Sequence, residues 1–160
     1  MRITARRLVV LAVGLILAIW LVLRLIPSDE NQIRGLIQQA AEALEDGNLD
    51  GAMKVISLSY RDGYGLTYGA WRVLFQRGFD KYVDIRVWIR GLEVQIHGDE
   101  AQATFSVRAE ATVAATTGDP DRLPVRDVGT VERARLHLNK EPWGWRVVSG
   151  EELRPDRWGL

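Results

Sequence analysis

The stretch VDIRVWIRGLEVQIH, residues 83–97, alternates apolar and polar side chains, which is typical of a β-strand with one face in a core. The alternation slips by one position at Gly91, so that Ile89 before it and Leu92 after it keep the same apolar phase. One extra residue at a glycine indicates a β-bulge, which bends and twists a strand. The sequence therefore predicts a long bent strand and a sheet curved over a layer of helices.

Helical periodicity fills the sequence before this strand. Apolar residues recur at three- and four-residue spacing over Ile33–Leu44, after Ser28, which can cap a helix. A second short pattern covers residues 48–56, where Asn48 can start a helix, and Thr67 can cap a third helix that we expect to end at Gly78. Three helices should therefore precede the long strand.

Three more strands are expected after it. Residues 101–113 alternate regularly, and residues 127–139 and 143–149 alternate on either side of a charged turn. Trp143 and Trp145 share a phase, so we expect both to close the core. Three helices followed by an antiparallel meander of about four strands define an α+β fold.

The first 26 residues predict a membrane anchor. An uncharged apolar run, residues 8–23, extends to residue 26 when the long side chain of Arg24 reaches the headgroups. A helix of about 19 residues is about 28 Å long, enough to span the hydrocarbon core of a bilayer. Acidic residues soon follow the run, and three arginines precede it: Arg2, Arg6 and Arg7. This asymmetry predicts a single-pass inner-membrane protein with its N-terminus inside and its domain in the periplasm.

A cleaved signal peptide is the alternative, but residues 24–28 (RLIPS) offer no small-residue cleavage site.

The composition excludes several classes of function. The chain has no cysteine, which excludes disulfides, thiol catalysis and a lipid-modified cysteine. Beyond residue 26 the net charge is −4, which argues against nucleic-acid binding. We expect an anchor at 1–26, one domain at 27–152 and a polar tail at 153–160.

Three segments carry a resemblance to a known family. They are ISLSYRDGYG (Ile56–Gly65) before the third helix, GDEAQATF (98–105) in a hairpin, and LNKEPWGWRVVSGEE (138–152) with its W-x-V strand. In this order they resemble the nuclear transport factor 2-like (NTF2-like, SnoaL-like) superfamily, which includes ketosteroid isomerase and polyketide cyclases. The resemblance covers about residues 29–151. It implies a cystatin/NTF2-like cone with a pocket between helices and sheet, and no particular activity.

Six residues are candidates for lining that pocket: Tyr60, Asp62, Trp71, Phe75, Phe105 and Trp145. Because enzymes of the superfamily place an acid, a histidine or a tyrosine in the cone, Asp62 with Tyr60 could be a base and a hydrogen-bond donor. The alternative is structural: the Asp62 carboxylate braces a turn by accepting backbone N–H groups, and Tyr60 packs its ring.

We expect no catalytic residue, metal site or cofactor. The inward phase of the strands carries no acid: Ile85, Val87, Ile89, Phe105 and Val107. The two histidines, His97 and His137, lack the clustered carboxylates that a metal site needs.

The outward phase of the sheet is a candidate interaction surface. Its members are rich in guanidinium groups: Arg86, Trp88, Arg90, Arg108, Arg133 and Arg135. Such a face suits an anionic or carboxylate-lined partner. Because Asp84, Glu93 and Glu110 are interspersed, a solvated face with cross-strand ion pairs is the alternative.

These observations favour a membrane-tethered, non-enzymatic accessory domain that binds a protein partner or a second copy through its sheet. The alternative is a small-molecule pocket, or a lyase or isomerase of the ketosteroid-isomerase kind that uses Asp62 and Tyr60. A folded spacer for the membrane segment is a third hypothesis. The first two differ in whether the cone is filled with side chains or hollow.

Overall fold

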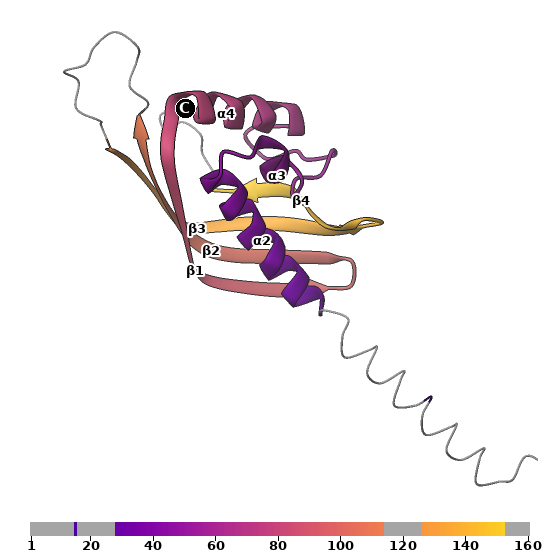
Figure 1. Ribbon diagram of the computed structural model, residues 1–160. Coiled ribbons are helices and arrows are strands. Elements are labelled where there is room, and N and C mark those ends of the chain that lie inside the picture. Colours follow the sequence, from indigo (N-terminus) through magenta and orange to yellow (C-terminus); the bar gives the residue numbers. More distant parts are fainter. Residues whose placement is uncertain (1–14, 16–27, 114–125, 153–160) are drawn as a thin grey trace, which may run out of the picture.

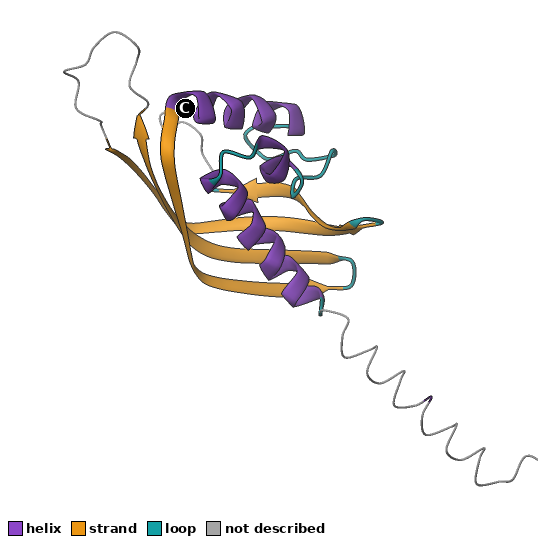
Figure 2. Ribbon diagram, viewed as in Figure 1, coloured by secondary structure: helices purple, strands orange, loops and turns teal. Residues whose placement is uncertain are grey.

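The structure is a computed structural model that describes residue 15 and residues 28–113 and 126–152. Three helices precede four strands: α2 (Asp29–Glu45), α3 (Leu49–Met53), α4 (Tyr68–Lys81), β1 (Tyr82–His97), β2 (Glu100–Val113), β3 (Arg126–Glu141) and β4 (Gly144–Glu151). The strands form one antiparallel sheet in the order β1-β2-β3-β4 (Figure 2). The predicted α+β layout is confirmed.

The predicted membrane segment, residues 8–26, lies outside the described residues except for Leu15, and the predicted tail at 153–160 lies outside them entirely. No helix in the described part of the chain is long and apolar enough to cross a membrane.

All three predicted helix caps are present. The Ser28 hydroxyl accepts a hydrogen bond from Asn31 N at 3.2 Å, and the Thr67 hydroxyl accepts one from Ala70 N at 3.3 Å. The side chain of Asn48 accepts from Gly51 N at 2.9 Å. Each cap satisfies a backbone N–H that the first turn of a helix leaves without a partner.

Two helices end elsewhere than expected. α4 continues through the buried Gly78 to Lys81 and passes directly into β1, so the glycine does not terminate it. α3 ends at Met53, and Ile56 instead forms a parallel bridge with Val147 of β4. The segment after α3 therefore extends the sheet at its β4 edge, where it satisfies backbone groups that would otherwise be unpaired.

The bulge at Gly91 is confirmed, and β1 contains a second one. Gly91 has a φ of +63°, and the register with β2 shifts by one residue between Arg90 and Glu93. A further shift lies between Val83 and Arg86, where Asp84 has a φ of +52°. Aspartate is one of the few residues other than glycine that visit this left-handed region. β1 therefore bends at two points.

Helix α2 lies across the concave face of the bent sheet (Figure 1). Its Ile33 and Ile37 are buried against the core that Ala103 and Leu138 share. Polar contacts at both ends also fix the helix. Arg34 Nη1 donates to the carbonyl of Leu92 at the Gly91 bulge, at 2.8 Å. Glu45 Oε1 accepts from the backbone N–H of Val87, at 2.7 Å.

The expectation that both tryptophans of the last hairpin are buried is wrong for one of them. Trp145 is 2% exposed, whereas Trp143 is 84% exposed. β4 begins only at Gly144, whose φ of +107° belongs to the turn, so Trp143 lies in the turn and outside the alternation of the strand.

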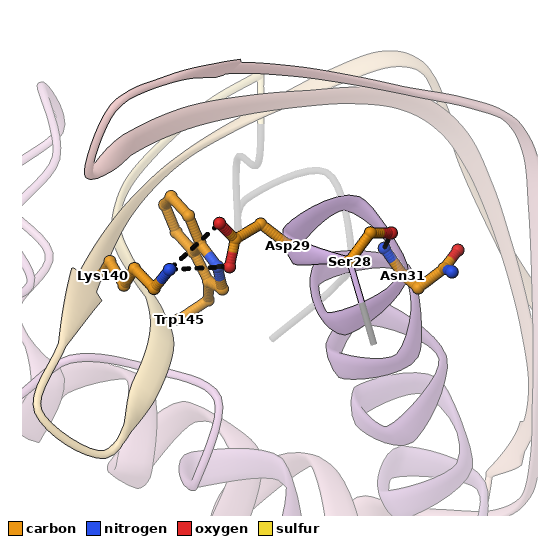
Figure 3. Close-up of polar contacts among 5 residues, drawn as sticks. All are labelled: Ser28, Asp29, Asn31, Lys140 and Trp145. Carbon is orange, nitrogen blue, oxygen red and sulfur yellow. Dashed lines mark hydrogen bonds and ion pairs between the residues drawn. The ribbon is translucent and has the colours of Figure 1, made fainter. Parts of the chain in front are cut away.

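The start of α2 is joined to the β3–β4 hairpin (Figure 3). Lys140 Nζ lies 2.8 and 3.0 Å from the two carboxylate oxygens of Asp29, and Trp145 Nε1 donates to Asp29 Oδ1 at 3.0 Å. The hydrogen bonds from Lys140 and Trp145 hold the pKa of the Asp29 carboxyl below its usual value. A carboxylate in the first turn also interacts favourably with the helix dipole.

We expect Asp29→Asn to lower the free energy of unfolding at pH 7. Because the pKa of Asp29 is depressed in the folded state, its stabilisation is complete above the unfolded pKa of about 3.9 and is lost as the pH falls through the folded value. Urea unfolding from pH 7 to pH 3 should therefore show the difference between variant and wild type shrinking below about pH 4.

Asp50→Asn is the matched control, since Asp50 pairs with Arg72 at an exposed site. It should change the free energy of unfolding by less than about 0.5 kcal/mol. An Asp29→Asn variant as stable as wild type at pH 7 would contradict the assignment.

Candidate functional site

A partly open cavity of about 250 Å³ lies between α2, α4 and the concave face of the sheet. All five strand residues expected to point inward line it: Ile85, Val87, Ile89, Phe105 and Val107. The rest of the wall is almost entirely apolar. This composition suits an apolar ligand and gives little for a charged one.

The cavity persists because small residues face large ones across it. Alanines and glycines line α2, the end of α4 and the inner sheet: Ala40, Ala41, Gly78, Ala109, Ala111 and Gly129. Helix α4 contributes three aromatic side chains to the lining: Trp71, Phe75 and Phe79. Protein interiors are normally packed to crystal-like density, so a space of this size is a distinctive feature of the fold.

Aromatic rings along α4 form one wall. Trp71, Phe75 and Phe79 follow each other at four-residue spacing, on one face of the helix. The Trp71 and Phe75 centroids are 5.3 Å apart, and the Phe75 and Phe79 rings are stacked at 6.5 Å. Tyr60 meets Trp71 edge-on at 6.2 Å. These faces can stack against a planar ring of a ligand.

The structure places the six candidate pocket residues differently. Four of them line the cavity: Tyr60, Trp71, Phe75 and Phe105. Asp62 is not among the lining residues, and Trp145 is buried beneath the start of α2. The cone is therefore not plugged by its tryptophans.

Asp62 is occupied in bracing its own loop. Its Oδ1 accepts hydrogen bonds from the backbone N–H groups of Tyr64 and Leu66, both at 2.9 Å. Its Oδ2 accepts from the Tyr60 hydroxyl at 3.1 Å. Burial, with the nearby Asp62 carboxylate, raises the pKa of the Tyr60 hydroxyl well above its usual value, so Tyr60 remains protonated. Tyr60 thus contributes to the cavity lining while its neutral hydroxyl donates to Asp62.

The indole nitrogen of Trp71 is buried and has no hydrogen-bond partner. A buried donor without a partner costs about 1–3 kcal/mol. A small displacement of the Trp71 side chain could direct this N–H toward an acceptor atom of a ligand.

Glu110 is a wall residue that the sequence did not indicate. We expected it on the exposed outer face, but it is 8% exposed and contributes to the cavity lining. Its carboxylate accepts from Arg108 Nη2 at 2.6 Å. No sequence signal could have found its burial, because the alternation of β2 is regular at this point.

The guanidinium-rich residues lie on the convex side of the sheet. Trp88 is 41% exposed and stands directly opposite Arg108 across β1 and β2. Arg86, Arg90 and Arg133 are exposed as well. Arg135 instead pairs with Glu151 at 2.6 Å.

His137 lies 3.1 Å from the other oxygen of Glu151. Hydrogen bonds from His137 and Arg135 lower the pKa of the Glu151 carboxyl. Part of this face is therefore occupied by cross-strand ion pairs.

Comparison with solved structures identifies the fold. A protein from Novosphingobium aromaticivorans, provisionally named an aromatic ring hydroxylase, superposes with a TM-score of 0.61 at 19% identity, over 76% of this chain and 85% of that one. A provisionally named dehydratase of the NTF2-like family from Streptomyces avermitilis gives 0.61 at 15%, over 77% and 93%. A provisionally named scytalone dehydratase, also from Novosphingobium aromaticivorans, gives 0.61 at 12%, over 75% and 79%.

No protein-family model matches the chain, and no curated protein matches its sequence. The structural likeness establishes that the described domain has the NTF2-like cone fold.

The expectation of a non-enzymatic domain that binds a protein partner is wrong. The cone is hollow and apolar, and its structural neighbours include proteins provisionally named as a hydroxylase and as dehydratases. The expectation rested on the membrane anchor and on the absence of an inward-facing acid, and neither determines whether the cone is hollow. An alternating pattern gives the polarity of a wall but not the volume that it encloses.

Substitutions at Asp62 test the brace. Asp62→Ala should lower the free energy of unfolding by about 3 kcal/mol, because it leaves two backbone N–H groups and the Tyr60 hydroxyl without their acceptor. Asp62→Asn keeps an oxygen for the two N–H groups and can donate its amide to Tyr60, so it should cost only about 1 kcal/mol. Equal losses for the two variants in urea unfolding would contradict this role.

Proposed function

We propose that the domain binds a small apolar molecule in its cone, as ligand or as substrate. The single observation that carries the proposal is the hollow, almost wholly apolar space between α4 and the sheet. A cavity lined in this way excludes ions and favours neutral molecules, because a charge moved there would lose its hydration without gaining a partner.

The size and the aromatic wall narrow the ligand class. A volume of about 250 Å³ exceeds the cavity of about 150 Å³ that holds benzene and is below that of most drug-sized pockets. Rings on α4 present flat faces. One- and two-ring neutral compounds fit both constraints.

Lyase or isomerase chemistry is the second candidate. It is favoured by Tyr60, whose protonated hydroxyl stands in the cavity wall beside the Asp62 carboxylate. Were a substrate oxygen to replace Asp62 Oδ2 as its acceptor, this hydroxyl could donate a hydrogen bond to that oxygen as charge develops there. Tyr60→Phe would then abolish turnover of a compound that the cone still binds.

We further infer that residues 8–26 hold the domain at a membrane, with the cone on the periplasmic side. The support is the sequence: an apolar run of spanning length, arginines before it and acidic residues after it.

Ligand binding should stabilise the protein and disappear when the cavity is filled. Toluene, indole or naphthalene at ten times its dissociation constant should raise the free energy of unfolding by about 1.4 kcal/mol, seen as a higher melting temperature. Ala109→Leu places three more carbons in the cavity and should weaken binding at least about tenfold. Thr104→Leu, on the same strand and the opposite face, is the control and should bind as wild type. If none of these compounds shifts the melting temperature, the cone does not serve this ligand class.

The anchor is tested in the full chain expressed in bacteria. The protein should stay in the membrane pellet after alkaline carbonate extraction. Leu15→Arg with Ile19→Arg should release it, because each charge at the centre of a span costs about 3 kcal/mol.

The orientation is tested by labelling. Since the chain has no cysteine, Val73→Cys on the exposed side of α4 gives a unique label site. Reaction with a membrane-impermeant maleimide in intact spheroplasts is expected for a periplasmic domain, and protection until lysis would reverse the orientation.

A further inference from the structure

Three segments meet at the end of the domain where α2 begins (Figures 1 and 3). Asp29 of α2 is bound by Lys140 and Trp145 of the β3–β4 hairpin. The backbone N–H of Lys140 donates to the carbonyl of Asp99 in the β1–β2 turn, at 2.8 Å. The β3–β4 hairpin is thus held against the first turn of α2 and cannot move independently of it.

Trp143 projects from this end. It occupies the turn between β3 and β4 and is 84% exposed, although tryptophan is among the more buried residue types. Trp145, two positions later, is 2% exposed. The hairpin therefore presents one tryptophan to the core and the other to the surroundings.

The chain leading to α2 sets how far this end can lie from a bilayer. The apolar run ends at Ile26, three residues before Asp29. Three residues span at most about 10 Å. The headgroup layer on each side of a bilayer is about 5–7 Å thick. On the inference that residues 8–26 span the membrane, Asp29, to which Lys140 and Trp145 of the hairpin are bound, lies at or near the headgroups.

We propose that Trp143 inserts into the headgroup layer of the membrane that holds the anchor, so that the β3–β4 hairpin is a second point of attachment. Tryptophan is the residue type that favours this layer, since its ring is apolar and its N–H can hydrogen-bond. Because the ion pair between Asp29 and Lys140 joins the hairpin to α2, an attachment at Trp143 would hold the whole domain at the membrane.

The charge at this end indicates which lipid chemistry is recognised. Asp99, Glu100 and Glu141 are acidic, and Lys140 is engaged by Asp29. An acidic rim is not attracted by anionic headgroups. The contact therefore depends on the ring of Trp143 and should form equally well on zwitterionic lipid.

Two attachment points would fix the height of the cavity above the membrane. The lining residues of α2 begin at Leu36, seven residues after Asp29. At 1.5 Å per residue this is about 10 Å further along the helix. The cavity then opens in the half of the domain away from the lipid, and its ligands would come from the aqueous side.

The absence of cysteine makes the proposal directly testable in the full chain. Pro142→Cys, which leaves the neighbouring Trp143 in place, and, as matched control, Val73→Cys each receive a nitroxide label, and the protein is reconstituted in phosphatidylcholine nanodiscs. Val73 is also an exposed apolar residue, 49% exposed, but lies on α4 (Figure 1). Accessibility to oxygen and to a water-soluble nickel chelate is then measured by electron paramagnetic resonance. An unchanged melting temperature establishes that each labelled variant is folded.

The proposal predicts a label at 142 that is at least about fivefold less accessible to nickel than the label at 73, with higher relative access to oxygen. Adding phosphatidylglycerol should leave both values unchanged. If the chain is held by the discs but both labels are equally accessible to nickel, Trp143 is not inserted and the anchor still stands. A label at 142 shielded from both reagents would instead indicate a protein contact and overturn the proposal. A chain that does not remain with the discs refutes the anchor and the insertion together.

Discussion

Two bulges in β1, at residues 84–85 and 91–92, each add a residue to the strand without adding a partner on β2, so the strand must bend twice. The bends curve the sheet around α2 and free backbone groups from the ladder. Arg34 of α2 donates to the Leu92 carbonyl at one bulge, and Glu45 accepts from the Val87 N–H, two residues beyond the other. The same distortion thus shapes the sheet and determines where the helix is held.

The hollow cone follows from this curvature and from the junction of α4 with β1. The helix passes into the strand without a loop, because Tyr82 is already extended where α4 ends. The direction of α4 is therefore set by the first residues of β1, and the helix cannot settle onto the sheet. Where its aromatic rings face alanines and glycines, space remains that a small apolar molecule can occupy.

Polar contacts hold together the end of the domain where α2 begins, away from the cavity. Asp29 joins the start of α2 to the last hairpin, and the Lys140 backbone joins that hairpin to the β1–β2 turn. Three segments far apart in the sequence are thereby fixed at the end that follows the apolar N-terminal run. The cavity and the end of the domain where α2 begins are separate parts of one domain, so a substitution in one can be tested without disturbing the other.

The sequence by itself determined the secondary structure and its order, because periodicity, helix caps and the glycine bulge are local properties. Ser28, Asn48 and Thr67 cap where their side-chain oxygens predict, and Gly91 bends β1 where the alternation slips. The inward phase likewise placed Phe105 on the cavity wall. The bulge at Asp84, the exposure of Trp143 and the burial of Glu110 were decided by tertiary structure. The hollow in the cone was also decided by tertiary structure. An enclosed volume depends on how side chains from distant segments pack together, and a local sequence pattern carries no information about that packing.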